Sequence, residues 1–323
     1  MKIVLAARLE ADERRTWLEA LAAACPGHEW SDLSDDTPGL GAAQHAAQRA
    51  DVALVANPAP GALSGVSGLR LVQSLWAGVE GLLADPTLPA DVPLARMVDP
   101  MMNAAMAETA LWAVLGLHRG FLDYADQQRR AVWHQFHQRR AEDVQVAVLG
   151  LGAMGGAVCA RLAQAGYRVA AWRRQAPPDS AAPAGVEVLT GADGLAVLLP
   201  RAQVLINLLP LTPSTRGVLG ADLFGQLPRG AAVLNFGRGG HLVEADLLAA
   251  LSDGTLSRAV LDVFATEPLP EAHPFWRHPR ITVLPHVAAL TDLRSASAVV
   301  ADNLRRLAEG LPLRHRVDRS RGY

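Results

Sequence analysis

A glycine-rich turn directly after a buried strand is the feature that most constrains the fold of this chain. The apolar run Val144–Leu149 predicts a strand, and Gly156–Ala165 predicts a helix. In such a unit the glycines permit a tight turn, close approach of a pyrophosphate and close helix–strand packing. A purely structural turn is the competing interpretation, which the strand–turn–helix context disfavours. The residues expected to bind a dinucleotide here are Gly150, Leu151, Gly152, Ala153, Met154 and Gly155.

The end of the following strand indicates which dinucleotide is used. An NAD site usually carries an acidic residue roughly 20 residues past the glycines, where it holds the ribose 2′-OH. This chain has Trp172, Arg173 and Arg174 at that place. Two arginines suit a 2′-phosphate through bidentate, charge-assisted contacts, whereas the simpler interpretation is a solvated basic strand end. We therefore expect these residues to bind NADP, with NAD as the less preferred cofactor.

Apolar runs separated by helical stretches occupy both halves of the chain. With 323 residues, the chain is too long for one ordinary core, so two domains are expected. Alternating strands and helices predict parallel sheets covered on both faces, and the alternation in the second half of the chain is typical of a doubly wound α/β domain. One long stretch, from about Asn103 to Arg140, is compatible with a continuous helix. The predicted strands are Lys2–Ala7, Asp51–Ala56, Leu69–Leu75, Val144–Leu149, Arg168–Trp172, Val204–Leu209, Ala231–Asn235, Ala259–Val263 and Ile281–Leu284.

Composition and charge exclude several classes of protein. Half of the residues are hydrophobic, 19% are charged, and the formal net charge is −2. These values argue against disorder, nucleic-acid binding and a membrane-surface role, and no apolar run is long enough to span a bilayer. The start of the chain reads as a strand rather than a signal peptide. Cys25 and Cys159 have no metal-ligand spacing, so we expect two reduced thiols, no bound metal and a cytoplasmic protein.

Three polar residues follow predicted strands beyond the glycine turn. Arg238, Glu267 and His286 each lie where a strand has ended. Ligands of open α/β sheets bind beyond the carboxyl ends of the strands, so the three side chains are expected to converge. A 2-keto acid needs a cation for its carboxylate and carbonyl, and a general acid for the developing alkoxide. An imidazolium beside a carboxylate supplies that acid near neutral pH. Taken singly, each residue also has a purely structural interpretation.

At these residues the chain resembles the D-2-hydroxyacid dehydrogenase family, and the resemblance covers nearly the whole chain. The segments that carry it are the glycine turn, Leu209–Thr215, Asn235–Gly240, Leu261–Pro268 and Pro285–Ala289. It implies a Rossmann-type doubly wound cofactor domain at 100–286. It also implies a smaller flavodoxin-like α/β substrate domain formed by 1–99 and 287–323, with the active-site crevice between the domains.

The resemblance also assigns roles to residues. Arg238 becomes the ligand of the substrate carboxylate and carbonyl, His286 the acid in reduction, and Glu267 its partner. The expected substrate-binding set is Trp76, Ala77, Gly78, Arg238 and His286. Leu209, Pro210 and Thr215 lie beside the cofactor in the family, and Asp262 lies near the nicotinamide carboxamide. A homodimer is the usual assembly.

Within the family, Gln73–Val79, His273–Pro279 and Val317–Tyr323 resemble the glyoxylate/hydroxypyruvate reductase A branch. This branch implies NADPH-dependent reduction of a small 2-keto acid to the D-2-hydroxy acid. Two departures bear on the substrate: Leu284 stands where the family usually has Thr, and the segment 56–58 lacks an expected aromatic. A reductase for a bulkier 2-keto acid is therefore an alternative. A nicotinamide-sensing regulatory or scaffold protein is a second alternative, from another functional class.

Overall fold

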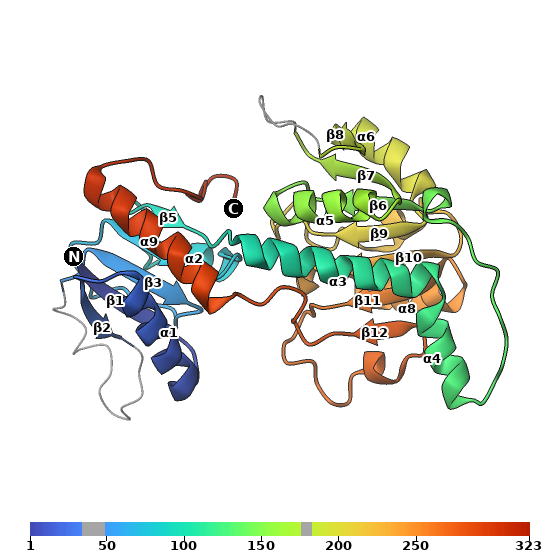
Figure 1. Ribbon diagram of the computed structural model, residues 1–323, viewed down its shortest axis with the longest axis horizontal. Helices are drawn as coiled ribbons and strands as arrows, with labels where there is room; N and C mark the ends of the chain where they lie inside the picture. Colours follow the sequence, from blue (N-terminus) through green and yellow to red (C-terminus); the bar gives the residue numbers. More distant parts are fainter. Residues whose placement is uncertain (34–48, 176–182) are drawn as a thin grey trace. The chain divides into compact units, whose positions relative to one another are not determined.

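The computed structural model describes residues 1–33, 49–175 and 183–323, which form two compact units. The first unit comprises Met1–Met101 and Thr291–Tyr323, and the second comprises Met102–Leu290. Both are built from parallel strands and helices (Figure 1).

The first unit contains a parallel sheet with strand order β2-β1-β3-β4-β5. This is the order of flavodoxin-like folds. Strand β3 is buried at every position, as expected for a parallel strand covered on both faces. Helices α1 and α9 pack against one another. The elements are β1 (Lys2–Ala7), α1 (Ala11–Ala24), β2 (Glu29–Asp32), β3 (Val52–Ala56), β4 (Leu71–Ser74), α2 (Glu80–Ala84), β5 (Leu94–Ala95) and α9 (Leu293–Glu309).

The second unit contains a parallel sheet with strand order β12-β11-β10-β9-β6-β7-β8. The order reverses between β6 and β9, as in Rossmann-type doubly wound sheets. The predicted fold class is therefore confirmed. The strands are β6 (Gln145–Leu149), β7 (Arg168–Arg173), β8 (Val186–Thr190), β9 (Val204–Asn207), β10 (Ala231–Asn235), β11 (Leu256–Leu261) and β12 (Ile281–Val283). The helices are α3 (Pro100–His118), α4 (Phe121–Arg129), α5 (Ala153–Gln164), α6 (Gly191–Leu198), α7 (Ala221–Phe224) and α8 (Glu244–Ser252), and the first residues of α3 belong to the first unit. The short 3-10 turns are η1 (Ala141–Asp143), η2 (Leu199–Arg201), η3 (Gly239–His241) and η4 (Pro274–Arg277).

The core of this unit lies on both faces of the sheet. Along β6, Val146 and Val148 belong to one apolar cluster, whereas Ala147 and Leu149 belong to another. Successive side chains of a strand point to opposite faces, so each cluster is one side of the sheet. This explains why the strands read as continuous apolar runs rather than as alternating patterns.

The strand register aligns the carboxyl ends of the central strands. Leu149 pairs with Asn207, Asn207 with Asn235, and Asn235 with Leu261, which in turn pairs with Val283. Residues that directly follow these strands therefore emerge along one edge of the sheet.

The expected continuous helix from Asn103 to Arg140 is wrong beyond His118. Helix α3 ends there, and Gly120 adopts a left-handed conformation with φ 70° before α4 begins. Ala131, with φ 52°, precedes a segment without regular structure. That segment contains Val132, Trp133 and Phe136, whose branched and aromatic side chains disfavour helix relative to Ala or Leu. Strands β2, β5 and β8 are short or partly exposed and were not predicted from the sequence.

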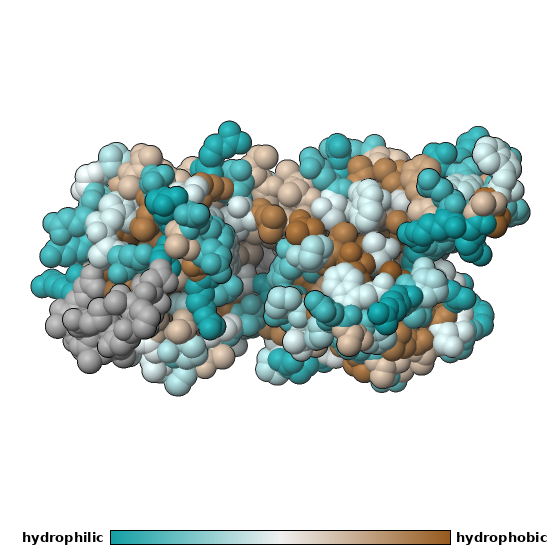
Figure 2. Space-filling model, turned by 90° about the horizontal axis from the view of Figure 1, so that it is seen from below, coloured by the Kyte–Doolittle hydropathy of each residue, from teal (hydrophilic) through white to brown (hydrophobic). Residues whose placement is uncertain are grey.

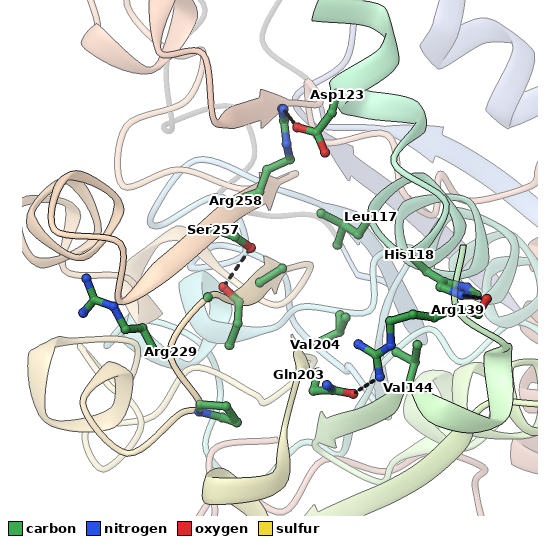
Figure 3. Close-up of a pocket in the computed structure, with 14 residues that line it drawn as sticks. Leu117, His118, Asp123, Arg139, Val144, Gln203, Val204, Arg229, Ser257 and Arg258 are labelled. Carbon is green, nitrogen blue, oxygen red and sulfur yellow. Dashed lines mark hydrogen bonds and ion pairs between the residues drawn. The ribbon is translucent and has the colours of Figure 1, made fainter. Parts of the chain in front are cut away.

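A cavity of about 350 Å³ lies at the amino ends of β6, β9, β10 and β11 (Figure 3). It is thus at the edge of the sheet opposite to the aligned carboxyl ends. Two of its arginines are already engaged, Arg258 with Asp123 at 2.6 Å and Arg139 with Gln203 at 3.1 Å. None of the predicted catalytic residues lines it.

Candidate active site

The three predicted catalytic residues follow adjacent strands at the carboxyl edge of the second sheet. Arg238 comes after β10, Glu267 after β11 and His286 after β12. Because these strands are parallel neighbours, their ends place all three residues at the same edge. The structure brings Glu267 and His286 into direct contact.

The side chains of His286 and Glu267 form a short hydrogen bond. The Nδ1 atom of His286 lies 2.7 Å from Oε2 of Glu267, and the side chains are 53% and 35% exposed. The other carboxylate oxygen, Oε1, accepts a hydrogen bond of 2.8 Å from the backbone N–H of Phe264. A carboxylate acceptor fixes the proton on Nδ1, so a second proton on this ring would be carried by Nε2.

The backbone around His286 is held by Asp262. His286 has φ 55°, in the left-handed region, and its N–H donates to the carbonyl of Asp262 over 2.9 Å. The Asp262 carboxylate accepts from the N–H groups of Val287 at 2.7 Å and Ala288 at 3.1 Å. Burial raises the pKa of the Asp262 carboxyl above its usual range, although these N–H groups and the nearby His286 lower it in part. Asp262 therefore sets the turn on which His286 is presented.

Arg238 lies in a turn directly after β10 and is partly buried. Its Nη1 atom donates to the carbonyl of Gly237 over 2.8 Å, which bends the side chain back over its own turn. The planar fork of a guanidinium matches the geometry of a carboxylate.

The glycine turn has the geometry of a phosphate cradle. Gly150 has φ 101°, and a Cβ atom there would lie 2.7 Å from the carbonyl oxygen of Leu208. A Cβ on Gly155 would lie 1.9 Å from the carbonyl oxygen of Gly150, so only glycine fits. Gly152 caps α5 without a side-chain hydrogen bond, and the space beside its Cα is open. The N–H groups of the first turn of α5 are thus suited to a pyrophosphate.

The end of β7 carries the two arginines expected to bind the 2′-phosphate on the ribose of NADP. The Nε atom of Arg173 is buried and has no hydrogen-bond partner within the described residues. A buried donor without an acceptor is costly, and a phosphate oxygen is the kind of group that satisfies it. Arg174 is exposed and reaches Ser214 Oγ at 3.4 Å, whereas Trp172 Nε1 donates to the Gly191 carbonyl at 2.8 Å. These residues fit a 2′-phosphate.

The loop after β9 is closed by its own side chains. Thr215 Oγ1 donates to the carbonyl of Pro210 over 2.7 Å and accepts from the N–H of Thr212 over 2.8 Å. Leu209 is buried against the core of the sheet. The loop is thereby set at the same edge as the glycine turn, since β9 and β6 are neighbours.

The predicted substrate loop lies in the first unit, directly after β4. Ser74 Oγ binds both the carbonyl and the N–H of Trp76, at 2.9 and 3.0 Å, and the Trp76 ring meets Trp17 edge-on. Within residues 1–33, 49–175 and 183–323, no hydrogen bond is made by the N–H groups of Ala77 and Gly78. Such N–H groups are available to an anionic ligand.

Sequence reasoning missed a group of polar residues beneath the Arg238 turn. Asn207, Asn235 and His241 are fully buried and hydrogen-bonded to one another or to the adjoining backbone. The available signal was an asparagine ending each of two apolar strands, because a polar side chain at such a position needs a partner.

Comparison with known proteins gives a family match over the second unit. Residues 111–288 match the model of the D-isomer specific 2-hydroxyacid dehydrogenase, NAD binding domain. Glyoxylate/hydroxypyruvate reductase A of Serratia proteamaculans (strain 568) is 42% identical over 279 residues, which cover 85% of this chain and 88% of that protein. The protein of the same name from Salmonella heidelberg (strain SL476) is 39% identical over 315 residues, 95% of this chain and 96% of the relative.

Solved structures resemble the chain over its full length. A D-isomer specific 2-hydroxyacid dehydrogenase from Xanthobacter autotrophicus Py2, in complex with NADPH and MES, has a TM-score of 0.90 and 36% identity, covering 100% of this chain and 99% of that one. An NADPH-dependent glyoxylate/hydroxypyruvate reductase from Sinorhizobium meliloti, in complex with NADP and sulfate, has a TM-score of 0.89, with the same identity of 36% and the same coverage.

Proposed function

Because the chain belongs to the D-isomer specific 2-hydroxyacid dehydrogenase family, we propose that it reduces small 2-keto acids, glyoxylate and hydroxypyruvate, with NADPH. The product is the 2-hydroxy acid, of D configuration where it is chiral. The observation that carries this proposal is the 2.7 Å pair of His286 and Glu267 at the carboxyl edge of the sheet.

Each site residue has a task in this reaction. When bound, the nicotinamide supplies the hydride that reaches the carbonyl carbon. Arg238 binds the substrate carboxylate and polarises the carbonyl, and the N–H groups of Ala77 and Gly78 are the substrate-binding groups that the first unit contributes. His286 donates a proton from Nε2 to the developing alkoxide, because that charge must be neutralised within hydrogen-bond reach. Glu267 accepts the hydrogen bond from Nδ1 and so holds the imidazole in place.

The cofactor assignment is supported by this chain's own residues and by its relatives. The Nε of Arg173, which has no partner among the residues that the structure describes, and the exposed guanidinium of Arg174 fit the 2′-phosphate that distinguishes NADP from NAD. Similar structures were solved with NADPH or NADP bound. Gly150–Gly155 would hold the pyrophosphate, and Leu209, Pro210 and Thr215 would border the nicotinamide side.

We further propose that the protein is a homodimer. Residues 131–140 are exposed throughout, and Trp133 is 92% exposed. The segment is nevertheless fixed, since the N–H of Phe136 donates to Tyr124 Oη at 2.9 Å and His118 Nε2 lies 2.8 Å from the Arg139 carbonyl. An ordered, exposed aromatic segment is typical of an interface. Hydrophobic residues also reach the surface of the molecule between hydrophilic ones on the face seen in Figure 2.

We propose a cytoplasmic location because both cysteines are free and buried. Among the described residues, no helix combines the length and the apolar character needed to cross a membrane.

A turnover assay tests the proposed function directly. We expect purified protein to oxidise NADPH when glyoxylate or hydroxypyruvate is added, and more slowly with phenylpyruvate. Faster turnover of phenylpyruvate would favour the bulkier substrate class. Absence of turnover with every keto acid, while NADPH still binds, would contradict the enzymatic function and favour a nicotinamide-sensing protein.

A further inference from the structure

A network of buried polar side chains lies under the turn that carries Arg238. Asn207 ends β9, Asn235 ends β10 and His241 ends the 3-10 turn η3, and each is 0% exposed. Polar groups at such depth are retained only where each donor and acceptor is paired, because an unpaired one is costly.

The two asparagines connect the ends of the two strands. The Nδ2 atom of Asn207 donates to Asn235 Oδ1 and to His241 Nδ1, each over 2.9 Å. Asn207 Oδ1 accepts from the N–H of Leu209 at 3.3 Å, at the start of the loop after β9. Asn235 Nδ2 donates to the carbonyl of Arg238 at 3.0 Å. The network is therefore hydrogen-bonded to the backbone of the turn that carries Arg238.

The surroundings of His241 determine its protonation. The backbone N–H of Arg238 lies 3.1 Å from His241 Nδ1, and a backbone N–H can only donate. Nδ1 is therefore unprotonated, and the neutral ring carries its hydrogen on Nε2. Nε2 lies 3.3 Å from the carbonyl of Pro210, which accepts that hydrogen. The imidazole thus joins the Arg238 turn at one nitrogen to the loop after β9 at the other.

There is little room for this arrangement to relax. A Cβ atom on Gly237 would lie 3.0 Å from both Asn207 Nδ2 and His241 Nδ1. Real Cβ atoms rarely come so close to other heavy atoms, so the turn is packed directly onto the network.

We propose that His241 is a positioning residue that fixes the substrate-binding turn of Arg238 and the cofactor-side loop at Pro210 relative to each other. The inference rests on the proposed function, in which Arg238 binds the keto-acid carboxylate and the loop borders NADPH. His241 is not assigned a contact with either ligand and acts through the backbone of the two segments.

Substitutions can separate the two nitrogens. In His241→Asn, the amide oxygen stands near the place of Nδ1, so the link to Arg238 is retained and the link to Pro210 is lost. In His241→Gln, the amide nitrogen stands near the place of Nε2, so the opposite link is retained. His241→Leu removes both and leaves the N–H of Arg238 unpaired. His118→Gln, at the opposite edge of the sheet, is the matched control.

The measurements are the KM for glyoxylate, the Kd of NADPH from fluorescence titration without substrate, and the Tm. We expect His241→Leu to raise both KM and Kd by about tenfold or more. His241→Gln should raise mainly the KM, and His241→Asn mainly the Kd. His118→Gln should change neither. Loss of Tm with KM and Kd unchanged within about twofold in all three variants would overturn the proposal.

A second measurement does not require the variants to fold or the enzyme to turn over. In protein labelled with ¹⁵N-histidine, the His241 ring should show the neutral form with hydrogen on Nε2 at neutral pH. A ring with hydrogen on Nδ1 would overturn the proposal. If the unmodified protein reduces neither keto acid, the proposed function fails, whereas the NADPH titration and the ring tautomer still decide the link between His241 and Pro210.

Discussion

At the scale of single residues, the proposed reaction depends on a few side chains that either lack a partner within the described part of the chain or form a short hydrogen bond to a carboxylate. Arg173 has a buried Nε without an acceptor among the described residues, and His286 has a carboxylate at 2.7 Å. A buried donor without an acceptor is costly in an isolated fold and is explained when a ligand supplies the acceptor, whereas the half-exposed His286–Glu267 pair is explained by a reaction that uses its proton. Arg238, by contrast, is supported by the backbone of its own turn.

The arginines at the end of β7 predict the cofactor preference. Replacing Arg173 and Arg174 together by glutamine should raise the KM for NADPH by roughly a hundredfold, because two charge-assisted contacts to phosphate are lost. The KM for NADH should change by no more than about twofold. Arg168→Gln, at the other end of the same strand, is the control. Equal use of both cofactors by the unmodified protein would contradict the assignment.

Arg238 predicts a strict requirement for a guanidinium. Arg238→Lys keeps the charge but replaces a planar fork by a point charge, so kcat/KM for glyoxylate should fall by about tenfold or more. The Kd of NADPH should remain near that of the unmodified protein. Arg229→Lys, which alters an arginine at the amino edge of the sheet, is the control. Near-normal kcat/KM in Arg238→Lys would remove Arg238 from substrate binding.

At the scale of elements, local sequence patterns predicted those helices and strands whose formation does not depend on long-range contacts. The buried strands β1, β6 and β10 and the helix after the glycine turn follow from apolar periodicity and turn chemistry. Residues 119–140 do not, because one glycine in the left-handed region ends α3, and the segment beyond α4 is held by side-chain contacts such as Tyr124 with Phe136. His241 was also missed, since its role depends on partners at the ends of two different strands and in the segments that follow them, which no local pattern reveals.

The packing of α5 against β6 predicts unequal effects for two neighbouring glycines. In Gly155→Ala, the new Cβ would lie 1.9 Å from the Gly150 carbonyl oxygen, so the backbone of α5 and that of the glycine turn would have to move apart. We expect a loss of about 1–3 kcal/mol or more in stability and a loss of NADPH binding. Gly156→Ala meets nothing within 4 Å and should bind NADPH normally. Calorimetry and fluorescence titration measure both effects, and equal tolerance of the two changes would contradict this packing.

At the scale of the whole molecule, the ordered segment of residues 131–140 predicts a second copy as its partner. Size-exclusion chromatography with light scattering should give twice the chain mass of 34.2 kDa. Trp133→Asp should shift the equilibrium towards the monomer, because a charge is placed in an apolar interface. Val197→Asp, at a side chain that is also exposed, should leave the mass unchanged. A monomeric unmodified protein would contradict the homodimer.

In the proposed reaction His286 donates the proton and Glu267 holds its ring through Nδ1. The decisive experiment measures kcat/KM for glyoxylate reduction in the unmodified protein, Glu267→Gln and His286→Ala. Glu267→Gln keeps the shape of the side chain but removes the carboxylate that fixes the proton on Nδ1, so its kcat/KM should fall while the Kd of NADPH stays near that of the unmodified protein. His286→Ala should lose about a hundredfold to ten-thousandfold while still binding NADPH. High activity in His286→Ala, or an unchanged kcat/KM in Glu267→Gln, would contradict this mechanism.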